Sequence, residues 1–134
     1  MKITYKNLLI CFILCTTLLS CRETGAQDQV KVISPKEMQK AIDSGSVQII
    51  DIRTPSEFQE GHLKNANNID FLSSTFKKEI SGLDKEKPVY IYCRSGNRSG
   101  KSVKDFLNAG FTEIYDLEVG IVGWKSEGLP VVFD

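Results

Sequence analysis

The sequence predicts one α/β domain, with a central parallel sheet of five strands and helices on both faces. Short apolar segments alternate with amphipathic ones from residue 30 onward, which is typical of β-α-β units. The apolar segments are nearly continuous, as expected of strands that are covered on both sides. The chain has 134 residues, a length that suits one domain and not two ordinary ones.

Five segments rich in apolar and β-branched residues are predicted to be the strands. They cover residues 30–33, 47–52, 66–69, 89–92 and 114–117. Segment 89–92 is the strongest, because all four of its residues are apolar or aromatic. Ligands of parallel sheets bind beyond the carboxyl ends of the strands, so Cys93, which follows this strand, lies where a site is expected.

Two predicted helices begin with the same local signal. Ser34 and Thr54 are each followed by proline and, three residues on, by glutamate, which is the pattern of a capping box. Gly45 is expected to end the first helix. Further helices are predicted over residues 72–80, with Phe76 and Ile80 facing inward, and over 99–109. A last helical turn is predicted over 121–125.

The first twenty residues are predicted to be a signal peptide. Lys2 and Lys6 precede an apolar run of about a dozen residues, shorter than the roughly 20 that span a bilayer. The run ends in Leu-Leu-Ser-Cys, which resembles the bacterial lipobox, and we expect a lipid on Cys21. The domains are then a signal peptide (1–20), a lipidated cysteine and tether (21–29), and the folded domain (30–134). The protein would be held on a membrane of a bacterial cell envelope, facing the periplasm or the exterior. The alternative is an ordinary signal peptide ahead of an incidental cysteine.

Removal of the signal peptide changes the charge and the cysteine content. The mature chain would carry 15 basic and 17 acidic residues, which provides no polybasic surface and makes nucleic acid an unsuitable partner. Cys11 and Cys15 leave with the signal peptide, and Cys21 carries lipid. Cys93 then remains as the one thiol, which suggests a reactive group, although buried free cysteines also occur in cores.

The residues after Cys93 combine several features that activate a thiol: Arg94, Ser95, Gly96, Asn97, Arg98 and Ser99. Gly96 and Asn97 tolerate left-handed backbone conformations, so the loop can curl and direct successive N–H groups inward. The helix that follows adds the positive end of its dipole, and two arginines add cationic groups. Each effect favours the thiolate and would also stabilise a persulfide anion. The two guanidinium groups would attract a small dianion such as thiosulfate.

The loop resembles the active-site loop of rhodaneses, Cys-Arg-x-Gly-x-Arg. Three further segments resemble motifs of that family in the same order, so the resemblance covers nearly all of the mature chain. They are residues 50–53 with Glu57, Phe58, Gly61 and His62 (Asp-x-Arg…Glu-Phe…Gly-His-Ile), Asn68-Ile69 (Asn-Ile), and residues 117–120 with Trp124 and 128–131 (Gly-Gly…Trp…Gly-Leu-Pro-Val). The resemblance implies a rhodanese-like fold.

It also implies a chemistry. Cys93 would be the nucleophile that accepts sulfur, the backbone amides of residues 94–99 would cradle it, and Arg94 and Arg98 would guide an anionic donor. Thiosulfate or a related donor would pass its outer sulfur to Cys93, and cyanide, a thiol or a protein thiol would then remove it. No metal or organic cofactor is implied. Two arginines in the loop favour thiosulfate over mercaptopyruvate by analogy with the family.

Other marked residues are expected to have structural roles. Asp51 and Arg53 are interpreted as an ion pair under the loop, and Glu57 as a helix-capping residue. His62 lies in a Gly-His turn, where a structural hydrogen bond fits better than a general base. A metal site would need more ligands than this histidine and one free thiol.

Three positions depart from the family pattern. Leu63 replaces the usual isoleucine, which is a mild change. Asn65 stands where glycine is usual, and asparagine can adopt the same backbone region. Val119 replaces the first glycine of the closing pair, and a β-branched residue is poorly suited to positive φ.

Other functions remain as alternatives. Cysteine phosphatases related to this fold place five residues between cysteine and arginine, whereas four separate Cys93 from Arg98, which makes a smaller ring that fits sulfur better. A dithiol reductase would need Cys-x-x-Cys, which the sequence lacks. A non-catalytic binding module and a persulfide carrier at the cell envelope also remain possible.

Overall fold

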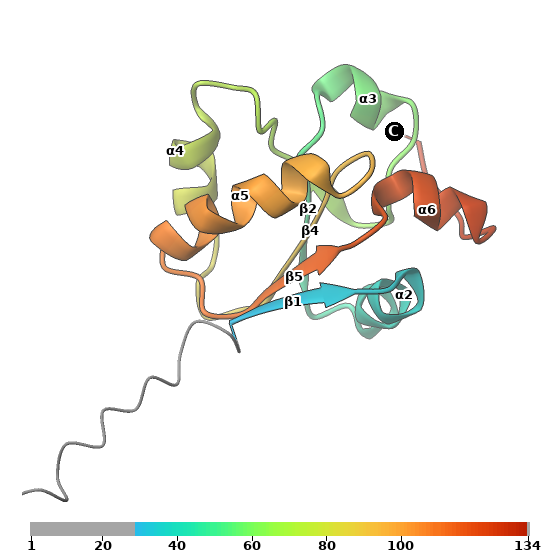
Figure 1. The fold of residues 1–134 in the computed structure, drawn as a ribbon, viewed down its shortest axis with the longest axis horizontal. Coiled ribbons are helices and arrows are strands. Elements are labelled where there is room, and N and C mark those ends of the chain that lie inside the picture. Colours follow the sequence, from blue (N-terminus) through green and yellow to red (C-terminus); the bar gives the residue numbers. More distant parts are fainter. Residues whose placement is uncertain (1–28, 134) are drawn as a thin grey trace, which may run out of the picture.

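The computed structural model describes residues 29–133, in which five strands and five helices alternate (Figure 1). In chain order they are β1 (Val30–Ile33), α2 (Pro35–Ser44), β2 (Gln48–Asp51), α3 (Pro55–Gln59), β3 (Ala66–Asn68), α4 (Phe76–Ser81), β4 (Val89–Tyr92), α5 (Asn97–Asn108), β5 (Ile114–Leu117) and α6 (Gly120–Ser126). The expected signal peptide, Cys21 and the tether up to residue 28 lie outside the described residues, as does Asp134.

The strands form one parallel sheet in the order β1-β5-β4-β2-β3, so the predicted fold class is confirmed. β4 lies in the middle, with Ile91 paired to Ile50 of β2 on one side and to Asp116 of β5 on the other. Because all strands run the same way, the carboxyl ends of β2, β4 and β5 meet at one edge of the sheet. The segments that leave these three strands are therefore neighbours.

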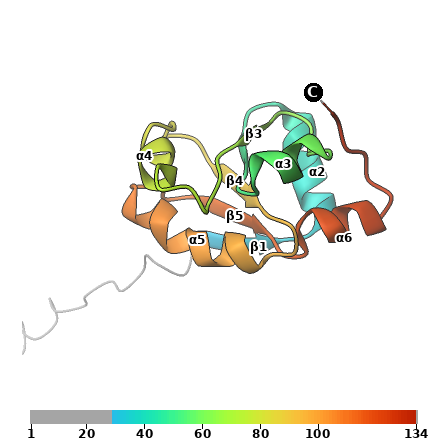
Figure 2. The ribbon, with the colours of Figure 1, turned by 90° about the horizontal axis from the view of Figure 1, so that it is seen from above.

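Helices cover both faces of the sheet (Figures 1 and 2), and an apolar core lies on each face. On one face, Ile91 packs with Phe76 of α4 and Phe106 of α5. On the other, Tyr92 packs with Met38 of α2 and Trp124 of α6. Successive side chains of β4 therefore enter opposite cores, which is why its sequence is apolar throughout.

The two predicted capping boxes are present. Ser34 caps α2 and Thr54 caps α3, and in each case the glutamate three residues on accepts a hydrogen bond from the backbone N–H of the cap residue. Gly45 ends α2 in the left-handed conformation, with φ of 71°. Both predicted helix starts are therefore confirmed by local hydrogen bonds.

Helix α4 begins four residues later than predicted. The side chain of Asp70 accepts a hydrogen bond from the N–H of Leu72 at 2.9 Å, and Ser73 Oγ accepts one from Thr75 N–H at 3.1 Å. Such local side-chain bonds offer the backbone an alternative to the helix. The two predicted inward residues, Phe76 and Ile80, are buried.

Helix α5 begins two residues earlier than predicted, at Asn97. Gly96 takes φ of 89° and turns the chain directly into the helix, so Asn97 and Arg98 belong to its first turn rather than to a loop. The left-handed conformation predicted for this loop is thus adopted by Gly96 and not by Asn97.

Asn65 and Val119, which replace glycines of the family pattern, adopt different backbone conformations. Asn65 takes φ of 64°, as predicted for asparagine in a position usual for glycine. Val119 takes an ordinary φ of −98° before α6, and the positive φ falls on Gly120 instead. Among residues 29–133, no helix is both long and apolar enough to cross a membrane.

Candidate active site

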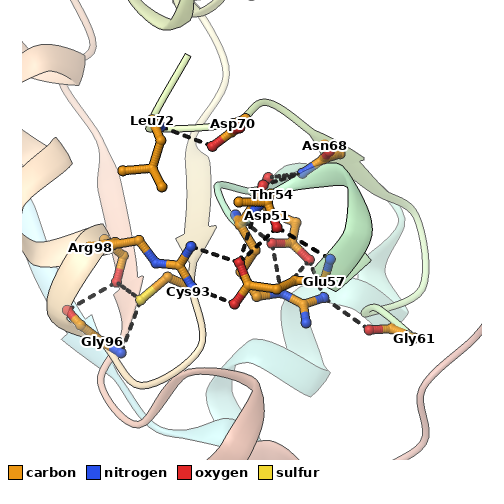
Figure 3. A network of polar contacts seen from close by, with 12 residues as sticks. Asp51, Thr54, Glu57, Gly61, Asn68, Asp70, Leu72, Cys93, Gly96 and Arg98 are labelled. Atoms are coloured by element: carbon orange, nitrogen blue, oxygen red, sulfur yellow. Dashed lines mark hydrogen bonds and ion pairs between the residues drawn. The ribbon is translucent and has the colours of Figure 1, made fainter. Parts of the chain in front are cut away.

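The sulfur of Cys93 lies at the carboxyl end of β4, where hydrogen-bond donors converge (Figure 3). Gly96 donates its backbone N–H to Cys93 Sγ at 3.1 Å, and the Ser99 hydroxyl donates to the same atom at 3.6 Å. The cysteine is 1% exposed. The 12-residue helix α5 begins four residues after it, so its positive N-terminal end favours negative charge at this place.

The loop is held by the turn between β5 and α6. Ile121 N–H donates to Cys93 O at 3.0 Å, and Val122 N–H donates to Arg94 O at 3.1 Å. A Cβ on Gly120 would lie 2.5 Å from the Arg94 carbonyl, and one on Gly96 would collide with the Glu118 carbonyl. The two backbones approach so closely that only glycine fits at both positions.

Arg98 is bound by Glu57, whose role exceeds the predicted helix cap. The guanidinium donates from Nη1 and Nη2 to the two Glu57 oxygens at 2.8 and 2.6 Å. These bonds lower the pKa of Glu57 to about 2 and raise the pKa of Arg98. Glu57 also closes the capping box of α3 with Thr54. The sequence carries no local signal for this pair, because its members are 41 residues apart.

Of the two arginines predicted to guide the donor, one therefore has a carboxylate partner. Arg98 is fixed beside the loop by Glu57, whereas Arg94 is exposed, as are Ser95 and Asn97. Figure 3 shows Arg98, Glu57 and Cys93 side by side. Arg94 thus presents its charge to solvent, whereas Arg98 contributes as part of a charge pair with Glu57.

Asp51 and Arg53 form a buried ion pair at the end of β2. Arg53 Nη2 lies 2.6 Å from Asp51 Oδ2 and donates to the Gly61 carbonyl at 2.9 Å. Burial lowers the pKa of Arg53, but the hydrogen bonds and charge of Asp51 outweigh this and raise it. Asn68 of β3 donates to the carbonyls of both Asp51 and Arg53, at 2.9 and 2.8 Å. The pair thus joins β2, β3 and the turn after α3.

His62 lies in the connection between α3 and β3 and is buried. Its ring stacks on Phe58 at a centroid distance of 3.7 Å, and Nδ1 lies 3.2 Å from the Phe58 carbonyl. Its backbone exchanges hydrogen bonds with Val132, at 3.0 and 2.9 Å. In the described part of the chain, no cluster of three or more His, Cys, Asp or Glu side chains could hold a metal.

Two buried or partly buried polar residues near the candidate site, Asn68 and Asp116, were not singled out as site residues from the sequence. Asn68 belongs to the Asn-Ile motif, but its bonds to the backbone of β2 become visible only with β3 paired to β2. Asp116 of β5 is buried, and its Oδ1 has no hydrogen-bond partner among residues 29–133. Its one sequence signal is a charged residue inside a strand that is otherwise apolar or aromatic.

Comparisons with known proteins agree with this architecture. The chain is 40% identical over 80 residues to the uncharacterized protein YqhL of Bacillus subtilis, covering 60% of this chain and 62% of YqhL. It thus spans less than two thirds of that relative. It is 33% identical over 94 residues to a protein of Allochromatium vinosum named sulfurtransferase, covering 70% and 86%.

A solved structure has the same fold. The crystal structure of a rhodanese-related protein from Thermoplasma volcanium superposes with a TM-score of 0.69 at 30% identity, covering 78% of this chain and 99% of that one. The model of the rhodanese-like domain family matches residues 34–127, well over half of the chain. With the parallel sheet and the Cys93 loop at its carboxyl edge, these matches lead to one conclusion: the chain belongs to the rhodanese-like domain family.

Proposed function

We propose that this protein is a sulfurtransferase that carries sulfane sulfur as a persulfide on Cys93. The observation that carries the proposal is the environment of Cys93 Sγ, which accepts hydrogen bonds from Gly96 N–H and the Ser99 hydroxyl at the start of α5. The name of the A. vinosum relative supports the same class of reaction.

The reaction would be a double displacement. The Cys93 thiolate attacks the outer sulfur of thiosulfate, the sulfur–sulfur bond breaks, and sulfite leaves with the bonding electron pair. The terminal sulfur of the persulfide then carries the negative charge. A nucleophilic acceptor (cyanide, a thiol or a protein thiol) attacks this sulfur, and the Cys93 thiolate leaves.

The surroundings of Cys93 supply the electrostatic part of this reaction. Arg94, exposed at the loop, would bind the incoming anion. Arg98, fixed by Glu57, would remain beside the sulfur in one position instead of following the donor into solvent. The helix dipole and the Gly96 N–H would stabilise the thiolate and the persulfide alike. A persulfide carrier differs from this proposal only in its acceptor.

The proposal is tested by loading the sulfur. The full chain, purified in mild detergent, is treated with thiosulfate, and the peptide containing Cys93 is analysed by mass spectrometry beside a cyanide-to-thiocyanate assay. We expect Cys93 to gain one sulfur atom and to lose it to cyanide. Cys93→Ser should gain none, while Cys21→Ser should still load at Cys93.

Two results would contradict the proposal in different ways. A Cys93 that is alkylated readily but takes no sulfur from thiosulfate, polysulfide or a protein persulfide would exclude transferase activity. A Cys93 that neither alkylates nor loads would leave a rhodanese-fold binding module.

We further propose that the protein is anchored to a membrane by a lipid on Cys21. The support is the sequence itself: two lysines, a short apolar run and Leu-Leu-Ser-Cys at its end. The domain would then act in the bacterial cell envelope, facing the periplasm or the exterior.

A further inference from the structure

Glu57 places a negative charge at the site that is proposed to receive an anionic sulfur donor. Both of its oxygens accept hydrogen bonds from the Arg98 guanidinium, at 2.8 and 2.6 Å. A guanidinium binds an anion through the same pair of N–H groups, and the pair as a whole carries no net charge. The carboxylate therefore occupies the group of Arg98 that a sulfur donor would otherwise bind.

The carboxylate of Glu57 is also fixed from the side of helix α3. Its Oε2 accepts hydrogen bonds from the backbone N–H and the hydroxyl of Thr54, at 3.0 and 3.1 Å. Hydrogen bonds from Arg98 and Thr54 lower the pKa of Glu57 to about 2, so the carboxylate is charged at neutral pH. An incoming anion thus competes for Arg98 with an acceptor that is both charged and held in place.

Arg98 lies beside the sulfur that would attack the donor. In the chain it stands between Gly96 and Ser99, which both donate hydrogen bonds to Cys93 Sγ. Figure 3 shows the pair of Arg98 and Glu57 next to Cys93. The side chains of Arg98 and Glu57 are only 21% and 26% exposed, so water screens their charges less than at an open surface. An anion that approaches the sulfur is therefore repelled by Glu57 as well as attracted by Arg98.

The other charged groups of the site do not replace the charge that Glu57 neutralises. Arg53 is buried and paired with Asp51 at 2.6 Å. Arg94 is exposed and has no carboxylate partner among residues 29–133. Helix α5 adds the positive end of its dipole. Without Glu57, the positive charge available to a sulfur donor would therefore be larger by one full unit.

We propose that Glu57 is a positioning residue that acts through Arg98 and lowers the preference of Cys93 for doubly charged sulfur donors relative to singly charged ones. This inference deepens the proposed function and rests on it for its consequence in sulfur transfer. A dianion is repelled by Glu57 about twice as strongly as an anion with one charge at the same place. An organic thiosulfonate, with one charge and an apolar group, therefore loses less than thiosulfate does.

Thiosulfate and methanethiosulfonate form a pair of donors that differ in this charge and react in the same way. The Cys93 thiolate attacks the outer sulfur of either donor, and the sulfur–sulfur bond breaks. Sulfite leaves in one case and methanesulfinate in the other, each with the bonding electron pair, and both reactions leave a persulfide on Cys93. A methyl group replaces one oxygen anion, so the comparison of the two donors measures the effect of one charge.

The first test does not depend on sulfur transfer. The full chain in mild detergent is treated with a mixture of iodoacetate, an anion, and neutral iodoacetamide, and both products on the Cys93 peptide are measured by mass spectrometry. Both reagents attack the same thiolate, so the ratio of the products does not depend on how much thiolate is present. In Glu57→Gln we expect the ratio of anionic to neutral product to rise about fivefold at low salt. Most of this rise should disappear at about 1 M salt.

Matched variants separate the charge of Glu57 from its structural contacts. Glu57→Asp keeps the charge but shortens the side chain, and should shift the ratio by less than half as much as Glu57→Gln. Glu37→Gln changes the corresponding position of the α2 capping box, which binds Ser34 and no arginine, and should leave the ratio unchanged. An unchanged ratio in Glu57→Gln, or an equal shift in Glu57→Asp, would overturn the inference.

The consequence for sulfur transfer is measured with the two donors. In Glu57→Gln, the ratio of the loading rates at low concentration, thiosulfate to methanethiosulfonate, should also rise about fivefold, because these donors again differ by one charge. The change should lie mainly in KM for thiosulfate and less in kcat. A shifted alkylation ratio with an unshifted donor ratio would contradict the selection of donors. If the wild type loads sulfur from neither donor, the proposed function fails, and the alkylation ratio alone then decides whether Glu57 disfavours anions at Cys93.

Discussion

Gly96 and Gly120 allow the loop after Cys93 and the turn before α6 to pass with their backbones in contact. Both have positive φ, of 89° and 56°, and both face carbonyl groups of the opposite segment. Ordinary side chains at these positions would be strained by the backbone and would also collide with it. The geometry around the sulfur therefore depends on two residues that contribute no functional group.

Alanine substitutions at Gly120 and Gly128 distinguish the cost of backbone strain from the cost of a steric collision. Gly120→Ala should destabilise the protein by about 3 kcal/mol or more, because positive φ and overpacking both contribute. Gly128→Ala also introduces a side chain at positive φ, of 74°, but nothing lies within 4 Å of its Cβ. It should cost only about 1 kcal/mol. Urea unfolding of both variants checks this, and equal losses would show that the contact with the Arg94 carbonyl is unimportant.

Helices α3 and α5 follow different strands and are joined by the pair of Glu57 and Arg98. The same glutamate caps α3 through Thr54, so the start of one helix and the first turn of the other are held by one carboxylate. Asp51 and Arg53 add a second, buried pair between β2 and the turn after α3. Helix α3 thus holds the side of the Cys93 loop opposite the β5–α6 turn.

The charge of Glu57 should make stability depend on pH. Its pKa is about 2 in the folded protein against an ordinary 4.5, so its contribution is fully present above pH 4.5 and is lost as pH falls toward 2. Glu57→Gln should reduce the free energy of unfolding by about 1 kcal/mol near neutral pH, as the pair is partly exposed. This difference should vanish below about pH 2.

Glu37→Gln is a matched variant that tests whether the pH dependence at Glu57 comes from its pair with Arg98. Glu37 closes the capping box of α2 in the same way but hydrogen bonds only to Ser34. Glu37→Gln should therefore show a smaller difference with a weaker pH dependence. Urea unfolding at a series of pH values checks both variants, and a Glu57→Gln difference that is constant down to pH 2 would contradict the role of Arg98.

In the whole molecule, the site lies at one edge of the sheet and the chain enters the domain through β1 at the outer strand position. Helix α3, the loop after Cys93 and the turn before α6 follow the carboxyl ends of β2, β4 and β5, respectively. Val30, the first residue of β1, lies at the amino-terminal edge of the sheet, opposite the edge that carries Cys93.

The proposed anchor predicts where the protein is found in cells. In a bacterial host that processes lipoproteins, the wild type should incorporate labelled fatty acid and sediment with membranes. Cys21→Ser should incorporate none, while Cys15→Ser, which changes a cysteine inside the apolar run, should behave as the wild type. Labelling of the Cys21→Ser variant would place the lipid elsewhere.

Much of the fold was predictable from the sequence because its signals are local. The two capping boxes, the left-handed Asn65 and the β4 strand each depend on neighbouring residues, and the structure has all of them. The start of α4 was predicted wrongly because the side chain of Asp70 and the hydroxyl of Ser73 bind the backbone where the apolar pattern suggested helix. The start of α5 was predicted late because Gly96 alone makes the turn.

By itself, the sequence determined the order of strands and helices and placed Cys93 with its glycine and arginines at a strand end. These features follow from periodicity and from residues within one or two turns of each other. Only the tertiary structure decided that Arg98 is bound by Glu57, that Asp116 pairs with Ile91 of β4, and that Gly120 closes on the Arg94 carbonyl. Each of these contacts joins residues at least 25 positions apart in the chain, and the parallel sheet brings them together by placing β2, β4 and β5 side by side.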